Sequence, residues 1–418
     1  MNRPRLIPGR PPLGTTAALA LVTALALLAP PLAAADLPGD AVPHRMNGPE
    51  PRDGTVDLQL EEIWRRGGED DEEVLLGIVT KVMTDAEGRL YVLDAQLSQI
   101  SVFSPEGELE QVLGRQGSGP GEFQNAQQMT FLPGGDAIGV AQMFPGKLVG
   151  INLDGSPAGD ITIGDAASGG FAVLINAACG GDNLVVSGLE ISVDQAAATM
   201  DRHHFVRSYD RAGKLLVEYL AKDVQWVFDA GFTLREQEAD FVWWRLGVDP
   251  EGRVVVGEPR EDYLLSVYAP DGRLERTFGR EYESWRRDER IHARFETMME
   301  AQTRQLPPGT ESEVAELEQD IWGVHCAADG SYWIVSSRGM YAPPAGVFTV
   351  WDVFSSEGEY LRQVQARVPG RPGTDLLFMT DHGYAVMVTG FWDAALAAMG
   401  VGQDEEAQAM EIICYRVL

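Results

Sequence analysis

Three carboxylates stand where they could hold a metal ion. Asp94, Glu190 and Glu258 each come at or just after the end of a short apolar run that is typical of a strand. Their oxygens suit Ca²⁺, which prefers carboxylate and carbonyl ligands. A carboxylate at the end of a strand also accepts hydrogen bonds from neighbouring loop amides, and this structural role is the one that we expect. We therefore predict no cofactor, with calcium at these three residues as the alternative.

Two further segments contain residues that could anchor a ligand. Trp243, Trp244 and Arg245 are consecutive, and Arg338 and Tyr341 lie close together further along the chain. Aromatic side chains and arginine are the usual anchors of binding patches. Neighbouring side chains of a strand point to opposite faces, so one of the two tryptophans must point into the packing. We predict that these five residues contribute to a binding surface.

Motifs of two common hydrolase classes are missing from the sequence. It contains neither the Gly-x-Ser-x-Gly motif of serine hydrolases nor the His-Glu-x-x-His motif of zinc proteases. Gly117–Gly121 is rich in glycine, but the Lys-Ser/Thr pair of a phosphate-binding loop does not follow it. We interpret this segment as a turn that needs free backbone angles.

The elements that must position these residues form a repeat. A short apolar run, preceded by a tight turn rich in Gly and Asp, occurs six times along the chain. The six runs are Leu90–Asp94, Ala137–Ala141, Leu184–Gly188, Val254–Glu258, Tyr332–Ser336 and Ala385–Thr389. Another apolar or alternating strand follows each run, and in most copies a glycine turn and one further strand come next. Such a repeat predicts a ring of sheets, which is a β-propeller.

The sixth copy ends at Leu418 without its outermost strand. Val56–Trp64 alternates between apolar and polar residues and is the natural replacement. If it pairs with the strand that carries Cys414, Leu58 and Leu60 lie on the last sheet and an open edge disappears. The predicted fold is an all-β, six-bladed β-propeller closed by the N-terminal strand. Seven blades are the alternative, if a long insertion hides another sheet.

The longest connections all belong to one face of the predicted ring. They either follow the second strand of a blade or lead from one blade to the next, and in a propeller these two kinds of connection share a face. In repeat proteins the elaborated face is often the binding face. We therefore place the predicted binding surface on this long-loop face.

A helical insertion is predicted between blades four and five, in residues 281–320. Ile291, Phe295, Met298 and Met299 recur there at helical spacing. Further on, Thr310 and Glu313 form a capping-box pattern that predicts a second helix.

The N-terminal 35 residues have the pattern of a secretory signal peptide. Basic residues come first, an apolar stretch of about 13 residues follows, and a small-residue cleavage site ends it. These parts are Arg3, Arg5 and Arg10, then residues 17–29, then Ala33-Ala34-Ala35. The apolar stretch is too short to span a bilayer as a helix. We expect an exported protein, periplasmic or extracellular, with a flexible mature N-terminus at 36–54 and the propeller at 55–418.

The charge of the chain limits its partners. Removal of residues 1–35, which hold three arginines and no acidic residue, changes the formal net charge from −30 to −33. Such a surface repels nucleic acid and anionic lipid. The three cysteines, Cys179, Cys326 and Cys414, are too few for a disulfide framework. We expect buried thiols, with one disulfide as an open alternative.

One segment of the chain resembles an NHL repeat. Ile100–Phe103, Gly107 and the glycine-rich connector Gly114–Phe123 carry this resemblance, although Ala126 stands near the place where the repeat usually has proline. The layout of residues 55–418 is similar to secreted bacterial six-bladed propellers of that class, including a helical insertion between blades four and five. Members of the class bind proteins, nucleic acids or small molecules, and a few are enzymes.

The resemblance also suggests which metal sites to consider. The amidating-lyase type of NHL propeller would need three channel histidines around zinc. Here His325 is expected in an innermost strand, whereas His382 is expected in a turn on the opposite face from the long loops. Lactonase-type propellers hold a divalent cation with carboxylates at the channel mouth, and Asp94, Glu190 and Glu258 would be the counterparts.

The sequence therefore favours an exported, non-catalytic binding or scaffold propeller. We expect a monomer that recognises a protein, a peptide or a glycan through its long-loop face. The alternative is a metal-dependent hydrolase or lyase, similar to the lactonases, with its site in the central channel.

Overall fold

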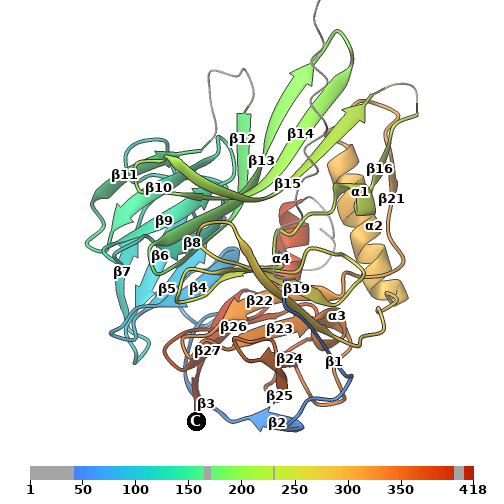
Figure 1. Cartoon of the computed structure of the whole chain (residues 1–418). Helices are drawn as coiled ribbons and strands as arrows, with labels where there is room; N and C mark the ends of the chain where they lie inside the picture. Colours follow the sequence, from blue (N-terminus) through green and yellow to red (C-terminus); the bar gives the residue numbers. More distant parts are fainter. Residues whose placement is uncertain (1–41, 164–170, 229–230, 400–408) are drawn as a thin grey trace, which may run out of the picture. The chain divides into compact units, whose positions relative to one another are not determined.

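Six mainly antiparallel sheets follow one another along the chain and form a ring (Figure 1). The protein is thus an all-β, six-bladed propeller, as predicted. The computed structural model describes residues 42–163, 171–228, 231–399 and 409–418. The predicted signal peptide lies outside the described residues. In each sheet the strands follow in sequence order from the innermost outwards, except for the outermost strands of the last three blades, which come from the N-terminal segment.

The first three blades have four strands each. Blade one consists of β4 (Val79–Thr84), β5 (Leu90–Asp94), β6 (Gln99–Phe103) and β7 (Leu109–Leu113). Blade two consists of β8 (Ala126–Phe131), β9 (Ala137–Gln142), β10 (Lys147–Asn152) and β11 (Pro157–Thr162). Blade three consists of β12 (Phe171–Gly180), β13 (Asn183–Asp194), β14 (Thr199–Tyr209) and β15 (Leu215–Val227).

Blades four to six incorporate strands from the N-terminal segment. Blade four consists of β17 (Leu246–Val248), β18 (Val254–Val256), β19 (Leu264–Tyr268), β20 (Leu274–Arg280) and β1 (His44–Asn47). Blade five consists of β22 (Ile321–Cys326), β23 (Tyr332–Ser336), β24 (Thr349–Phe354), β25 (Tyr360–Ala366) and β2 (Thr55–Leu58). Blade six consists of β26 (Leu376–Met379), β27 (Tyr384–Val388), β28 (Glu411–Val417) and β3 (Leu60–Gly67).

Local chemistry explains why the repeat folds into blades. All five residues of β5 are buried, because neighbouring blades cover both faces of each sheet. The turn before β5 is held by Asp85, whose Oδ1 accepts hydrogen bonds from the backbone N–H groups of Glu87 and Arg89. Gly88 completes the turn with a φ of +80°, a conformation that glycine adopts without strain.

The N-terminal segment closes the ring, as predicted. β3 pairs antiparallel with β28, so that Trp64 lies opposite Cys414 and Leu60 opposite Val417. The prediction for Leu58 is wrong, because the chain changes partner at Gln59 instead of forming one long strand. β2 pairs parallel with the outer strand of blade five and places Leu58 opposite Ala366.

The same segment reaches blade four as well. β1 pairs parallel with β20, and this strand lies before residue 55, where we expected the propeller to begin. Asn47 donates hydrogen bonds to the carbonyl oxygens of Gly279 and Gly358 and accepts one from the N–H of Tyr360. The N-terminal segment therefore runs along the outer edges of three successive blades and ties two of them together.

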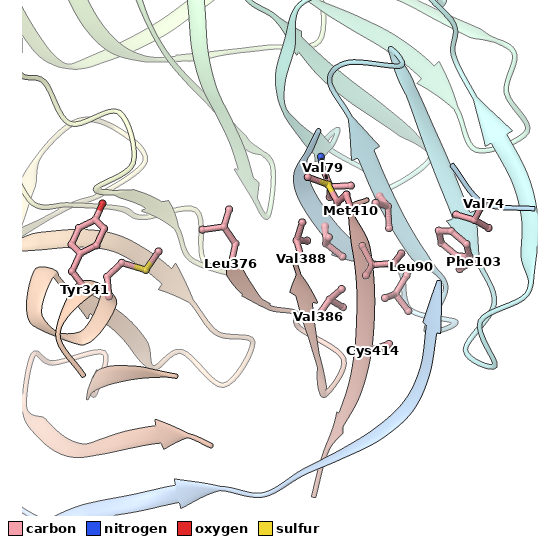
Figure 2. Close-up of a cluster of buried hydrophobic side chains, with 14 of the residues drawn as sticks. Val74, Val79, Leu90, Phe103, Tyr341, Leu376, Val386, Val388, Met410 and Cys414 are labelled. Carbon is pink, nitrogen blue, oxygen red and sulfur yellow. Dashed lines mark hydrogen bonds between the residues drawn. The ribbon is translucent and has the colours of Figure 1, made fainter. Parts of the chain in front are cut away.

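Blade six packs on blade one at the seam where the ring closes. Figure 2 shows Val388 and Cys414 of blade six facing Leu90 and Val79 of blade one. All four residues are fully buried. Met410 joins them, with its sulfur 3.3 Å from the backbone nitrogen of Val79. Burial of each aliphatic side chain among them contributes about 1.5–3 kcal/mol, so this packing stabilises the closed ring.

The insertion between blades four and five contains one of the two predicted helices. α2 (Glu289–Thr303) begins after Asp288, whose carboxylate accepts a hydrogen bond from the N–H of Ile291. The second predicted helix is wrong. Glu311–Glu313 forms strand β21, which pairs parallel with β16 (Thr233–Arg235). Glu313 forms an ion pair with Arg235 at 3.0 Å, so its carboxylate is not available to cap a helix.

The other long connections also contain regular structure. In blade three the long connection is a continuation of β13, β14 and β15, which project beyond the neighbouring sheets (Figure 1). Short helices fill three other connections: α1 (Glu236–Ala239), α3 (Ser337–Tyr341) and α4 (Phe391–Ala398). None of the helices in the described part of the chain is long and apolar enough to cross a membrane.

The three cysteines are all free. Cys179, Cys326 and Cys414 lie on β12, β22 and β28, in three different blades. Only Cys414 is fully buried, and the other two are partly exposed.

Substitution of Trp64 should test the ring closure. Its ring lies 5.6 Å from that of Phe103, and its Nε1 donates to the carbonyl oxygen of Pro105, so it joins β3 to blade one. We expect Trp64→Ala to lower the free energy of unfolding by roughly 3 kcal/mol in urea titrations. Glu61→Ala, an exposed change on the same strand, should cost less than about 0.5 kcal/mol. Equal effects of the two changes would contradict the assigned role of β3.

The central cavity as a candidate functional site

A cavity of about 750 Å³ lies at the centre of the ring. The innermost strand of every blade contributes to its wall, and α2, α4 and the long strands of blade three contribute further residues. The long-loop face therefore surrounds a cavity and is not a flat surface.

Aromatic side chains dominate this wall. Seven of the nine tryptophans of the chain line the cavity: Trp226, Trp243, Trp244, Trp322, Trp333, Trp351 and Trp392. The side chain of Trp244 is 42% exposed, which leaves a large apolar surface available for contact. Trp243 packs beside Phe241 at 4.8 Å and His204 at 5.3 Å between ring centroids.

Three of the five predicted binding residues line the cavity. Trp243 and Trp244 do so from the segment before β17, and Tyr341 does so from α3. Tyr341 is 6% exposed; its hydroxyl accepts a hydrogen bond from Nε1 of Trp322, and its ring stacks on Trp285 at 5.7 Å. Tyr341 is thus a buried, packed part of the wall.

Arg245 lies behind the wall, which corrects the expectation that it contacts a ligand. It is 1% exposed, and its guanidinium donates to both carboxylate oxygens of Asp240, to Oε1 of Gln319 and to the carbonyl oxygen of Gly257. Because Asp240 is only five residues away, this ion pair holds the segment that contains Trp243 and Trp244 in place.

Arg338 also lies away from the cavity wall. It is exposed on α3, and its guanidinium donates to the carbonyl oxygen of Glu283 at 3.0 and 3.1 Å. It thus holds the start of the insertion instead of facing the cavity.

A second ion network anchors the insertion that contains α2. The guanidinium of Arg287 is fully buried, pairs with Glu236 at 2.6 Å and Glu318 at 2.8 Å, and lies over the ring of Phe295. Arg260 pairs with Glu236 at 2.9 Å. Burial alone would raise the pKa of Glu236, but the hydrogen bonds from Arg287 and the charge of Arg260 hold that pKa below its usual value. Both acids of the network are therefore matched by arginine.

The three candidate calcium ligands are used by the protein itself. Asp94 is 1% exposed and accepts hydrogen bonds from the backbone N–H groups of Gly77, Ile78, Gln96 and Leu97. This is the structural role that we expected for it.

The other two carboxylates have side-chain partners. Glu190 accepts from Arg207 at 3.0 Å, and Glu258 accepts from the hydroxyl of Tyr268 at 2.7 Å. Asp94, Glu190 and Glu258 lie in three different blades, and none of them lines the cavity. Within residues 42–418, apart from the three undescribed gaps, no three His, Cys, Asp or Glu side chains are grouped so that they could hold a metal ion.

A polar cluster lies on the cavity wall toward the face opposite the long loops. His325 lines the cavity from β22, and its Nε2 lies 4.0 Å from Oδ1 of Asp381. Burial lowers the pKa of His325 and that of Lys81, which lines the cavity from β4, and the charge of Asp381 partly opposes both shifts. His382 does not line the cavity, and its Nδ1 lies 3.0 Å from the hydroxyl of Thr84.

Three cationic residues of the wall were not predicted as site residues, namely Lys81, Arg202 and Arg260. Lys81 lies on an innermost strand, where strand alternation could have indicated it. Arg202 lies on the part of β14 that projects beyond the neighbouring sheets, so its position could not be assigned from the repeat pattern of the sequence.

Comparisons with known proteins agree with the fold. A family model described as a 6-bladed beta-propeller matches residues 69–172. No curated protein matches the chain.

Several solved structures are similar. A Bacteroides fragilis protein inferred to be exported has 12% identity and a TM-score of 0.47, with 90% of this chain and 99% of that chain covered. A member of the DUF4221 family from Bacteroides vulgatus has 13% identity and a TM-score of 0.48, with 86% and 98% covered. Virginiamycin B lyase from Staphylococcus aureus has 8% identity and a TM-score of 0.41, with 87% and 100% covered. At these scores the similarities carry no argument about function.

The role of Asp94 can be tested by mutation and by chelation. Because its carboxylate accepts from four backbone N–H groups, we expect Asp94→Ala to lower the free energy of unfolding by about 3 kcal/mol. Treatment of the wild-type protein with EDTA should leave its Tm unchanged in differential scanning calorimetry. A Tm that falls on chelation and recovers with added calcium would restore the calcium alternative.

His204 should make the stability depend on pH. It is fully buried, and burial followed by the charges of Arg202 and Lys222 lowers its pKa to about 4. The unfolded chain takes up a proton near pH 6.5, whereas the folded protein does so only near pH 4, so stability is lost as the pH falls through this window. Between pH 7 and pH 5 the loss from this histidine should be about 2 kcal/mol.

The matched variant for this measurement is His204→Gln, which cannot titrate. Urea unfolding at pH 7 and pH 5 should show a larger loss of stability for the wild type than for the variant. Parallel losses in the two proteins would show that His204 does not titrate in this way.

Proposed function

We propose that this chain is an exported propeller that binds a ligand in its central cavity without changing it chemically. The cavity of about 750 Å³ with seven tryptophans on its wall is the observation that carries the proposal. Sites for small molecules are typically concave, about 300–1,000 Å³ in volume, and lined by aromatic and apolar residues with a few polar groups. The cavity fits this description.

The size of the cavity selects among the ligand classes that the sequence suggested. A folded protein domain is far larger than the cavity and could present only a protruding segment to it. A short peptide segment, a few sugar units or a small organic molecule could enter and bury apolar surface against Trp243 and Trp244. We therefore favour these smaller ligands over a protein surface.

The surroundings of the cavity favour binding over catalysis. Glu236, Asp240 and Glu318 on its wall are each paired with arginine, so their carboxylate oxygens are already occupied. Asp94, Glu190 and Glu258 have their own partners elsewhere, so the metal-dependent hydrolase or lyase lacks the ligand set that suggested it. The signal-peptide pattern of residues 1–35, the strongly acidic composition and the likeness to secreted NHL propellers support export of the protein.

Binding of a neutral fluorescent probe, N-phenyl-1-naphthylamine, would test the cavity. We expect one molecule to bind per chain, and Trp244→Ala to weaken binding about tenfold, because this side chain offers exposed apolar surface on the wall. Arg338→Met, a change on the same face but away from the cavity, should leave the affinity unchanged. Fluorescence titration measures all three proteins.

Two outcomes would contradict this proposal. If the probe binds several sites, or if Trp244→Ala binds it as tightly as the wild type, the cavity is not the binding site. If mass spectrometry shows that peptides, oligosaccharides or organic acids incubated with the protein are converted to new products, the protein is an enzyme.

A further inference from the structure

The charges on the cavity wall do not cancel completely. Eight acidic or basic side chains line it: Lys81, Arg202, Glu236, Asp240, Arg260, Glu318, His325 and Asp381. Three of the acidic side chains lie on the long-loop side, and each is paired with arginine. Glu236 pairs with Arg260 and Arg287, Asp240 with Arg245, and Glu318 with Arg287. At the other end, Asp381 lies near His325 and acts on Lys81 through its charge. Arg202 is left as a cation without an acidic counterpart.

The planar guanidinium of Arg202 has one contact on its face and one at its Nε atom. The guanidinium lies over the ring of Trp226 at 3.9 Å, and its Nε is 3.5 Å from Nε2 of His204. Within the described residues it forms no ion pair within 4.0 Å, and its two Nη atoms have no hydrogen-bond partner. These two Nη atoms are therefore available to donate two parallel hydrogen bonds to a carboxylate or a phosphate.

The neighbourhood keeps this cation charged and unmatched. Burial lowers the pKa of Arg202 to about 10, which still leaves it protonated at neutral pH. His204 stays neutral there, because its pKa is about 4, so it neither repels nor neutralises the guanidinium. A partly buried charge without a partner is costly, and an anionic ligand would offset this cost. Most other arginines of this acidic chain already have a carboxylate partner.

We propose that Arg202 binds the anionic group of the ligand, so that the cavity takes organic acids with a carboxylate, sulfonate or phosphate group and an apolar body. The apolar body would lie against aromatic side chains of the same cavity wall, Trp226 and Trp244 among them. This inference rests on the proposed function, because it concerns the ligand of the same cavity.

Two probes with the same ring system distinguish the contribution of the negative charge to binding from that of the apolar contact. 1-Anilinonaphthalene-8-sulfonate carries a sulfonate, and N-phenyl-1-naphthylamine is its neutral counterpart. For the wild type we expect the sulfonate to bind at least tenfold more tightly than the neutral probe. Arg202→Met keeps a long side chain but removes its charge. It should lower the affinity for the sulfonate probe at least tenfold and the affinity for the neutral probe less than twofold.

Two further variants complete the experiment. Arg202→Lys keeps the charge but loses the planar fork, so it should recover only part of the sulfonate affinity. Arg338→Met should bind both probes like the wild type. Because the neutral probe reports on the folded cavity, its unchanged affinity shows that Arg202→Met is folded.

The outcomes distinguish the two proposals. If the neutral probe binds but Arg202→Met binds the sulfonate as tightly as the wild type, the proposal of an anion site at Arg202 is wrong. The proposal of a ligand-binding cavity is then still supported. If neither probe binds the wild type, the cavity is not a ligand site and both proposals fall.

Discussion

The pairing of β3 with β28 is the interaction on which the rest of the structure depends. It joins residues from the two ends of the described chain in one sheet, with Trp64 opposite Cys414, and gives the last blade its fourth strand. The cost in chain entropy of bringing these distant segments together is offset by the buried seam between blades six and one. Because the cavity wall takes one strand from each blade, a ring that opened here would lose its central site.

The ring alone would give an open channel, and two sets of buried ion pairs convert it into a cavity with a defined wall. Arg245 with Asp240 fixes the segment of Trp243 and Trp244, and Arg287 with Glu236 and Glu318 fixes the insertion. Buried pairs of this kind add little net stability, but removal of one partner is costly, so they specify one arrangement. The long connections are thus held in place by buried contacts and form part of the site.

The parts of the fold that depend on local chemistry could be predicted. The apolar run Leu90–Asp94 and the Asp–Gly turn before it specify a strand and a hairpin without distant partners. Thr310 and Glu313 failed as a helix signal, because the partner that decides their structure is β16, far away in the sequence. Arg245 looked like an anchor because its sequence position shows neither its burial nor its carboxylate partner, and Arg202 was missed because its strand extends beyond the predicted repeat.

The net charge of −30 determines how an anion site in this protein could work. The acidic surface repels an approaching anion, so long-range steering cannot help it to enter. Salt screens that repulsion beyond about 8 Å at physiological ionic strength, whereas a contact with Arg202 inside a partly desolvated cavity is screened much less. A small inorganic anion would gain only this contact. An organic acid would also remove apolar surface from water against the tryptophans, at about 25 cal/mol per Å². The same wall therefore favours ligands that combine one negative charge with a large apolar body.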